Sequence, residues 1–161
     1  MNTNTPSSFY DLSIKSINGE TIELSEFKGQ YVLFVNVASF CGFTSQYAEL
    51  QQLHESYPKL TIIGVPCNQF GFQEPGNAKE IQTFCQSKYN IEFLLTEKTK
   101  VKGKGKHPVY QWLTDKELNG KDDYSVSWNF NKFLIDNEGQ LVGHFGSSIS
   151  PNDTKITSII K

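Results

Sequence analysis

The sequence predicts a single α/β domain with a mixed central β-sheet and helices on both faces. Residues 31–38 and 60–66 form two nearly continuous apolar runs, which are typical of strands buried on both faces. Between them, apolar residues recur at helical spacing from Tyr47 to Tyr57. Such a strand–helix–strand unit is normally right-handed and parallel. Apolar segments on either side of Gly139 predict an antiparallel hairpin, so we expect the sheet to be mixed.

The chain is expected to open with a β-hairpin. Residues 10–17 carry apolar side chains up to the turn pair Asn18-Gly19, and residues 21–24 return. Residues 1–8 are polar, and we expect them to form a flexible tail.

The helix after the first buried strand is expected to take its N-cap from Thr44 or Ser45. A polar loop over residues 67–76 follows the second buried strand. A further helix then starts at Asn77, with Glu80 placed to complete a capping box.

After residue 90, the sequence predicts shorter strands and helices. A strand over residues 91–95 is followed by a lysine-rich loop over 98–106. Pro108 suits the first position of a helix that continues to about Leu118. The hairpin over 132–145 and a last helix complete an order that fits a thioredoxin-like domain.

Length and charge limit the function classes. A chain of 161 residues, taken here as one domain over residues 1–161, is long enough to form a single hydrophobic core. A formal net charge of −2 argues against nucleic acid as the main partner. No apolar run approaches the roughly 20 residues of a membrane span, so we expect no integral membrane association. Without a signal-like N-terminus, and with three cysteines, the chain is expected to be cytoplasmic with free thiols.

Cys41 is the first candidate for chemistry. It follows a buried strand and precedes a helix, and ligands of open α/β sheets bind beyond the carboxyl ends of the strands. A helix N-terminus favours the thiolate, which is the nucleophilic form. Position alone equally fits a small buried apolar residue. Thr44 stands where a Cys-x-x-Cys motif has its second thiol, so a redox-active Cys41 needs a distant cysteine or an external thiol.

The other cysteines and the histidines give weaker signals. Cys85 is the natural distant partner, although packing in the core explains it as well. Cys67 is expected to be structural and half-buried. His54, His107 and His144 share no metal-ligand spacing with the cysteines, so we expect no metal and no cofactor.

Three segments together resemble the glutathione peroxidase family. Residues 36–44 resemble the active-site segment, with Cys41 where some members carry selenocysteine. Residues 64–76 and 128–134 resemble the second and third signatures of the family. The resemblance implies a thioredoxin-like fold and an enzyme that reduces hydrogen peroxide and organic or lipid hydroperoxides.

The resemblance also implies a catalytic tetrad of Cys41, Gln69, Trp128 and Asn129. Cleavage of a peroxide moves negative charge from sulfur to the departing oxygen. The amides of Gln69 and Asn129 and the indole N–H of Trp128 can donate hydrogen bonds to that charge.

The segment around Cys85, residues 84–89, resembles the resolving-cysteine segment of the thioredoxin-dependent, phospholipid hydroperoxide type of member. This implies a Cys41–Cys85 disulfide that thioredoxin or glutathione reduces. The short connection between Leu95 and Trp128 resembles members that lack an oligomerisation loop, which implies a monomer.

Two other functions use the same residues. A thiol–disulfide oxidoreductase of thioredoxin type is disfavoured by Thr44. A peroxide sensor or redox relay would share the oxidation of Cys41 with a peroxidase, so the sequence leaves it open.

Three positions depart from the family pattern. Residues 144–147 replace the usual Arg-Tyr-x-Pro, Phe93-Leu94 replaces Phe-Pro, and Asn131 replaces a common Thr. These positions concern the packing around the last strands more than the implied tetrad, so we expect them to bear on substrate and reductant preference and not on the basic chemistry.

Overall fold

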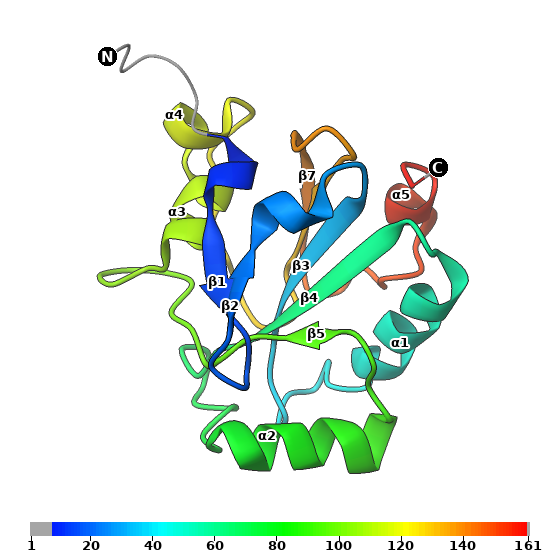
Figure 1. The fold of residues 1–161 in the computed structure, drawn as a ribbon. Coiled ribbons are helices and arrows are strands. Elements are labelled where there is room, and N and C mark those ends of the chain that lie inside the picture. Colours follow the sequence, from blue (N-terminus) through cyan, green and yellow to red (C-terminus); the bar gives the residue numbers. More distant parts are fainter. Residues whose placement is uncertain (1–7, 161) are drawn as a thin grey trace.

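The molecule is built around a five-stranded mixed sheet (Figure 1), seen in a computed structural model that describes residues 8–160. The strand order is β5-β4-β3-β6-β7, with β3, β4 and β5 parallel and β6 and β7 antiparallel. The strands are β3 (Tyr31–Val37), β4 (Leu60–Pro66), β5 (Leu94–Leu95), β6 (Lys132–Ile135) and β7 (Leu141–Phe145). The predicted fold class is confirmed, whereas the predicted tail lies outside the described residues except for Ser8.

Helices and an N-terminal hairpin surround this sheet. The hairpin pairs β1 (Ser13–Lys15) with β2 (Thr21–Glu23), and short 3-10 turns at Phe9–Asp11 and Leu24–Phe27 flank it. The helices are α1 (Gln46–Ser56), α2 (Ala78–Phe84), α3 (Pro108–Thr114), α4 (Lys116–Asn119) and α5 (Thr154–Thr157). A π-helical turn, Cys85–Tyr89, continues α2. The capping box predicted for Asn77 and Glu80 is present.

Two predicted elements differ from those observed. The strand expected over 91–95 is reduced to β5, because this edge segment pairs with β4 only at Leu94 and Leu95. The helix expected from Pro108 to Leu118 is split at Asp115. The backbone of Asp115 is extended, and its carboxylate accepts a hydrogen bond from the Glu117 N–H, which starts α4 as a separate helix.

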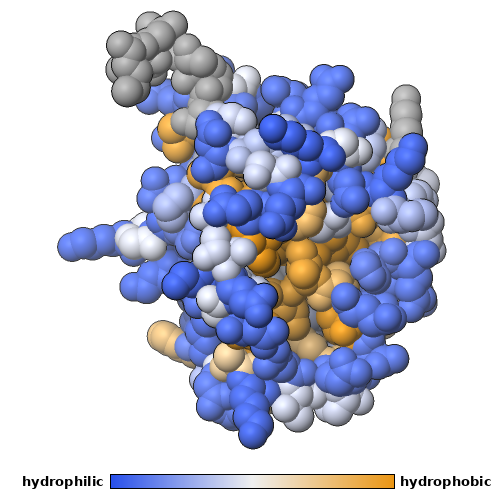
Figure 2. Space-filling model, in the orientation of Figure 1, coloured by the Kyte–Doolittle hydropathy of each residue, from blue (hydrophilic) through white to orange (hydrophobic). Residues whose placement is uncertain are grey.

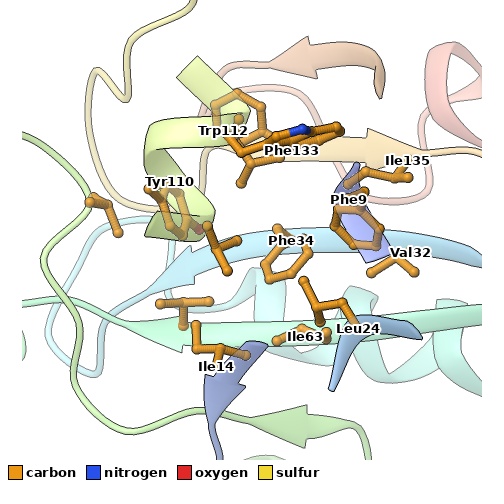
Figure 3. Packing of buried hydrophobic residues seen from close by; sticks show 14 of the residues in the cluster. Phe9, Ile14, Leu24, Val32, Phe34, Ile63, Tyr110, Trp112, Phe133 and Ile135 are labelled. Carbon is orange, nitrogen blue, oxygen red and sulfur yellow. The ribbon is translucent and has the colours of Figure 1, made fainter. Parts of the chain in front are cut away.

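Both faces of β3 are covered, which explains its continuous apolar sequence. Val32 and Phe34 point into a cluster that includes Phe9, the hairpin and α3 (Figure 3). Leu33 and Val35 point into a second cluster with α1, α2 and α5. Alternate side chains of a strand point to opposite faces, so one strand supplies two cores.

The strand directions bring three loops to one edge of the sheet. Val37 pairs with Pro66 at the ends of the parallel strands β3 and β4. Antiparallel β6 starts opposite the same end of β3, where Lys132 pairs with Val35. The loops after β3, after β4 and before β6 therefore meet beyond the carboxyl end of β3.

The edge strand β5 borders a cavity of about 410 Å³ whose lining includes Ile17, Cys85 and Phe93. Figure 2 shows apolar side chains exposed in the region of β4 and β5. Within residues 8–160, no helix has the length and apolar character needed to cross a bilayer.

The turn between β6 and β7 provides a stability test. Gly139 has φ +80°, and a Cβ there would lie 2.7 Å from Cε2 of Tyr10. Gly19 has φ +85° with open space around it. We expect Gly19→Ala to cost about 1 kcal/mol through left-handed strain, and Gly139→Ala to cost roughly 1–3 kcal/mol more through the clash. Urea unfolding of both variants measures the difference, and equal losses would contradict the predicted clash.

Candidate active site

Cys41 lies in a tight turn between β3 and α1. Its backbone N–H donates to Oγ1 of Thr44 (2.9 Å), and that hydroxyl donates to the carbonyl of Ala38 (2.9 Å). Its Sγ is partly buried and accepts a hydrogen bond from the N–H of Phe43 (3.4 Å). Of the two predicted N-cap residues, Ser45 occupies the position but makes no capping side-chain hydrogen bond. Thr44 instead cross-links the cysteine turn.

Gln73 joins the cysteine turn to the loop before β6. Its backbone carbonyl accepts a hydrogen bond from the N–H of Phe40 (3.0 Å). Its side-chain Oε1 accepts from Nδ2 of Asn129 (2.9 Å). The Nε2 of Gln73 donates no hydrogen bond to the described part of the chain, so a donor remains free at this junction.

Gln69, which the family resemblance placed in the tetrad, makes its hydrogen bonds to the lysine-rich loop and not to the cysteine turn. Its Nε2 donates to the carbonyl of Lys102 (3.0 Å), and its Oε1 accepts from the N–H groups of Val101 (2.7 Å) and Lys102 (3.2 Å). Both ends of the amide therefore anchor the lysine-rich loop. The structure brings Gln73, not Gln69, to the cysteine turn and Asn129. The two glutamines stand four residues apart in one motif, and the sequence offers no signal that separates them.

The glutamine loop turns sharply beneath Trp128. Gly71 and Phe72 both have left-handed backbones, with φ +66° and +53°. The indole packs against Phe70 at 5.7 Å between ring centroids. A Cβ at Gly71 would lie 3.1 Å from Cη2 of Trp128, so glycine permits the close approach. This contact places the indole, which is 37% exposed, over the loop that carries Gln73.

Asn129 is fully buried, and its Oδ1 has no hydrogen-bond partner among the described residues. Buried polar atoms are normally paired, so an unpaired acceptor at this point suits a water or a bound ligand.

Glu74 is a buried carboxyl group that the sequence interpretation missed. Its Oε1 accepts hydrogen bonds from the backbone N–H (3.1 Å) and the hydroxyl (2.6 Å) of Ser39. Burial raises the pKa of Glu74, although the hydrogen bonds from Ser39 and the charge of Lys98 oppose this. Glu74 fixes the loop after β4 to the residues that precede Cys41.

Cys85 begins the π-helical turn and is almost completely buried. Burial raises the pKa of its thiol to about 11, a shift that the neighbouring Tyr47 hydroxyl partly offsets and Glu74 adds to. The rings of Tyr47, Phe84 and Tyr89 pack against one another with centroids 5.4–6.3 Å apart. Cys41, Cys67 and Cys85 are all free thiols in this structure.

Cys67 is more deeply placed than expected. It is completely buried rather than half-buried, with its Sγ 3.5 Å from Oε1 of Gln69, and burial raises its pKa. Among residues 8–160, no group of three or more His, Cys, Asp or Glu side chains is arranged to hold a metal ion.

An apolar groove of about 650 Å³ lies beside the cysteine turn. Its lining includes Phe40 of the cysteine turn and Ile81 and Phe84 of α2. Phe40 is 65% exposed, and its ring lies 6.3 Å from that of Phe84. The groove offers an apolar surface next to the thiol-bearing segment.

Solved structures place the molecule in the thioredoxin-like class. A thioredoxin-family thiol:disulfide interchange protein from Chlorobium tepidum superposes with a TM-score of 0.62 at 14% identity, covering 98% of each chain. The apo structure of Trgpx superposes with a TM-score of 0.74 at 33% identity, covering 97% of each chain.

Sequence relatives identify the family. Residues 9–114 match the family model "Glutathione peroxidase". The chain is 46% identical to the "Glutathione peroxidase" of Lactococcus lactis, covering 90% of this chain and 93% of the relative. It is 42% identical to the "Glutathione peroxidase-like peroxiredoxin 2" of Saccharomyces cerevisiae, covering 95% and 97%. It is 39% identical to the "Hydroperoxy fatty acid reductase gpx1" of Synechocystis, covering 95% of each. The chain belongs to the glutathione peroxidase family.

The raised pKa of Cys85 predicts a pH-dependent loss of stability. An unfolded thiol titrates near pH 8.5, so between about pH 8.5 and 11 the unfolded state loses its proton first. The stabilisation is therefore complete below this range and is lost as the pH rises through it. Relative to Cys85→Ala, we expect the unfolding free energy of the reduced wild type to fall by about 1 kcal/mol per pH unit. Urea titrations at pH 8, 9 and 10 measure this, and parallel profiles would contradict it.

Proposed function

We propose that this protein is a thiol peroxidase in which Cys41 attacks a hydroperoxide and Cys85 resolves the product. The observation that carries the proposal is the junction at Gln73. Through it, the turn of Cys41, the loop after β4 and Asn129 meet beyond the end of β3.

The reaction balances in three steps. The Cys41 thiolate attacks one peroxide oxygen, the O–O bond breaks, and the sulfur becomes a sulfenic acid. The departing alkoxide or hydroxide takes up a proton from the solvent and leaves as an alcohol or water. The Cys85 thiol then attacks the sulfenic sulfur, which forms a disulfide and releases water. A thioredoxin dithiol reduces that disulfide by exchange and is itself oxidised.

Hydrogen-bond donors support the first step. Gln73 has a free amide Nε2, and the Trp128 indole lies over the same loop. Neutral donors aimed at a developing oxyanion stabilise the transition state more than the ground state. We therefore assign to Gln73 the role that the family resemblance implied for Gln69, and we keep Cys41, Trp128 and Asn129 in theirs.

The packing around Cys85 supports the second step. Cys85 is buried and its thiol is free, and a disulfide needs Cα atoms within about 7 Å, so we expect the segment around Cys85 to move when the thiol pairs with Cys41. The segment that we expect to move is a π-helical turn capped by Asn90, which has φ +52°. π-helical turns are rare and occur mostly at functional sites.

Substrate and reductant follow from the surroundings and the relatives. The groove beside Phe40 suits the chain of an organic or lipid hydroperoxide, as the name of the Synechocystis relative also suggests. The name of the yeast relative includes peroxiredoxin, which supports thioredoxin as reductant, with glutathione as the alternative. We further propose a cytoplasmic monomer that needs no metal or cofactor.

The two glutamines can be separated by mutation. We expect Gln73→Leu to lower the second-order rate constant for oxidation of Cys41 by hydrogen peroxide about tenfold or more, because it removes a donor to the leaving oxygen. Gln69→Leu should leave this rate within about twofold and should speed tryptic cleavage at Lys100 to Lys106, because that loop loses its anchor. Rapid mixing and limited proteolysis test both expectations, and the reverse pattern would restore Gln69 to the site.

Coupled turnover tests the whole cycle. NADPH oxidation is measured with cumene hydroperoxide, using thioredoxin with its reductase or glutathione with its reductase. We expect turnover with thioredoxin, none with Cys41→Ser, and a loss of at least about a hundredfold with Cys85→Ser, because the sulfenic acid then has no internal thiol partner. Cys67→Ala is the matched control and should retain activity.

The outcomes separate the alternatives. Equal turnover with glutathione in wild type and Cys85→Ser would show that an external thiol resolves Cys41 directly. Oxidation of Cys41 without turnover, together with a stable disulfide to another protein, would favour the relay over the enzyme.

A further inference from the structure

Asn131 lies at the centre of a hydrogen-bond network behind the Trp128 turn. Its Nδ2 donates to the carbonyl of Trp128 (3.1 Å) and to Oγ of Ser147 (3.1 Å). Its Oδ1 accepts from the N–H and the hydroxyl of Ser127 (3.2 Å each). These contacts determine which atom of the Asn131 amide is the oxygen and which is the nitrogen, because a backbone N–H can only donate and a backbone carbonyl can only accept.

His144 on β7 completes the network from the other side. Its Nε2 lies 2.7 Å from Oδ1 of Asn131, and since that oxygen only accepts, Nε2 carries the proton. The imidazole packs against Phe133 (4.7 Å between centroids) and Tyr124 (5.4 Å). Burial and the charge of Lys132 lower the pKa of His144, so the ring is neutral near pH 7.

Ser147 links the network to Asn129. Its hydroxyl donates to the backbone carbonyl of Asn129. Its own carbonyl accepts from Nε2 of Gln46 (2.7 Å) and from the buried ammonium of Lys132 (3.1 Å). Ser147 is therefore held by a helix and a strand while it holds Asn129.

The backbone between these contacts is strained. Phe130 has φ +61°, which is unfavourable for a bulky side chain, and it is fully buried. Such conformations persist only where the surroundings over-determine them. Trp128 and Asn129 are the two residues that precede this strained position, and their carbonyls are the atoms that Asn131 and Ser147 bind.

We propose that Asn131, His144 and Ser147 act as one set of positioning residues for the Trp128–Asn129 turn. They hold the strained turn so that the Trp128 indole stays over the glutamine loop and the Asn129 amide stays on Gln73. None of the three contacts the Cys41 sulfur. Their effect on the peroxidase reaction passes through the turn, and in that respect the inference rests on the proposed function.

Matched substitutions test this role. His144→Phe keeps an aromatic ring between Phe133 and Tyr124 but removes the donor, whereas His144→Gln keeps a donor at similar reach. Ser147→Ala removes the hydrogen bond to Asn129, and the exposed neighbour Ser148→Ala is the control.

Two readouts distinguish positioning from general stability. The first is the second-order rate constant for oxidation of Cys41 by hydrogen peroxide at 25 °C, measured after circular dichroism has shown that each variant is folded. We expect about a fivefold fall in His144→Phe and Ser147→Ala, in line with one lost hydrogen bond, and values within twofold of wild type in His144→Gln and Ser148→Ala. The second is acrylamide quenching of Trp128 in a Trp112→Phe background, which should increase only in the two impaired variants.

The outcomes distinguish a positioning role of these residues from the alternatives. Wild-type rates in His144→Phe and Ser147→Ala, together with a large loss in Trp128→Phe, would overturn the positioning role and leave the proposed site intact. Wild-type rates in Trp128→Phe as well would overturn the proposed site itself. A slow His144→Gln with unchanged quenching would show that the histidine acts through packing alone, which also contradicts the inference.

Discussion

The amide of Asn36 joins the strand that leads to Cys41 to the turn that carries Trp128. It lies in the buried strand β3, where its Nδ2 donates to the carbonyl of Trp128 (2.9 Å) and its Oδ1 accepts from the N–H of Asn131 (3.0 Å). Its backbone carbonyl also accepts from the N–H of Phe130 (2.6 Å). An unpaired amide at this depth would cost about 1–3 kcal/mol, so these contacts are required as a set. The strand that leads to Cys41 and the turn that carries Trp128 depend on these contacts for their common geometry.

The two thiols of the proposed cycle lie in parts of the molecule that are stabilised differently. Around Cys41, Thr44 accepts a hydrogen bond from the N–H of Cys41 within the turn, and Glu74 accepts one from the N–H of Ser39 across to the next loop; such bonds fix direction as well as distance. Around Cys85, aromatic packing dominates, and the backbone follows a π-helical turn with fewer ideal hydrogen bonds. Non-directional contacts can be broken and remade in another arrangement. A two-thiol reaction requires a rigid site around the attacking cysteine and a less stable segment around the second cysteine that can open.

Local patterns predicted most of the fold, because each rests on a short-range physical rule. The apolar runs of β3 and β4 and the capping box at Asn77 are examples. The choice between Gln69 and Gln73 depends on the course of the loop after Gly71, which spacing does not encode. The departures at Asn131 and in residues 144–147 looked unrelated in the sequence, but the structure joins them through His144 and Ser147 into one network. Contacts between distant segments decide such cases, and one sequence does not report them.

The π-helical turn at Cys85–Tyr89 also affects how this helix tolerates changes in length. An α-helix rotates by about 100° per residue, so inserting or deleting one residue normally turns every side chain beyond it to a new direction. A π-helical turn holds one extra residue within a single helical turn, so only the side chains of that turn change direction. The capping box at Asn77 and the left-handed Asn90 can then keep their places while the thiol between them changes direction. Related chains could therefore shift their second cysteine by one position along this helix without rebuilding the core beneath it.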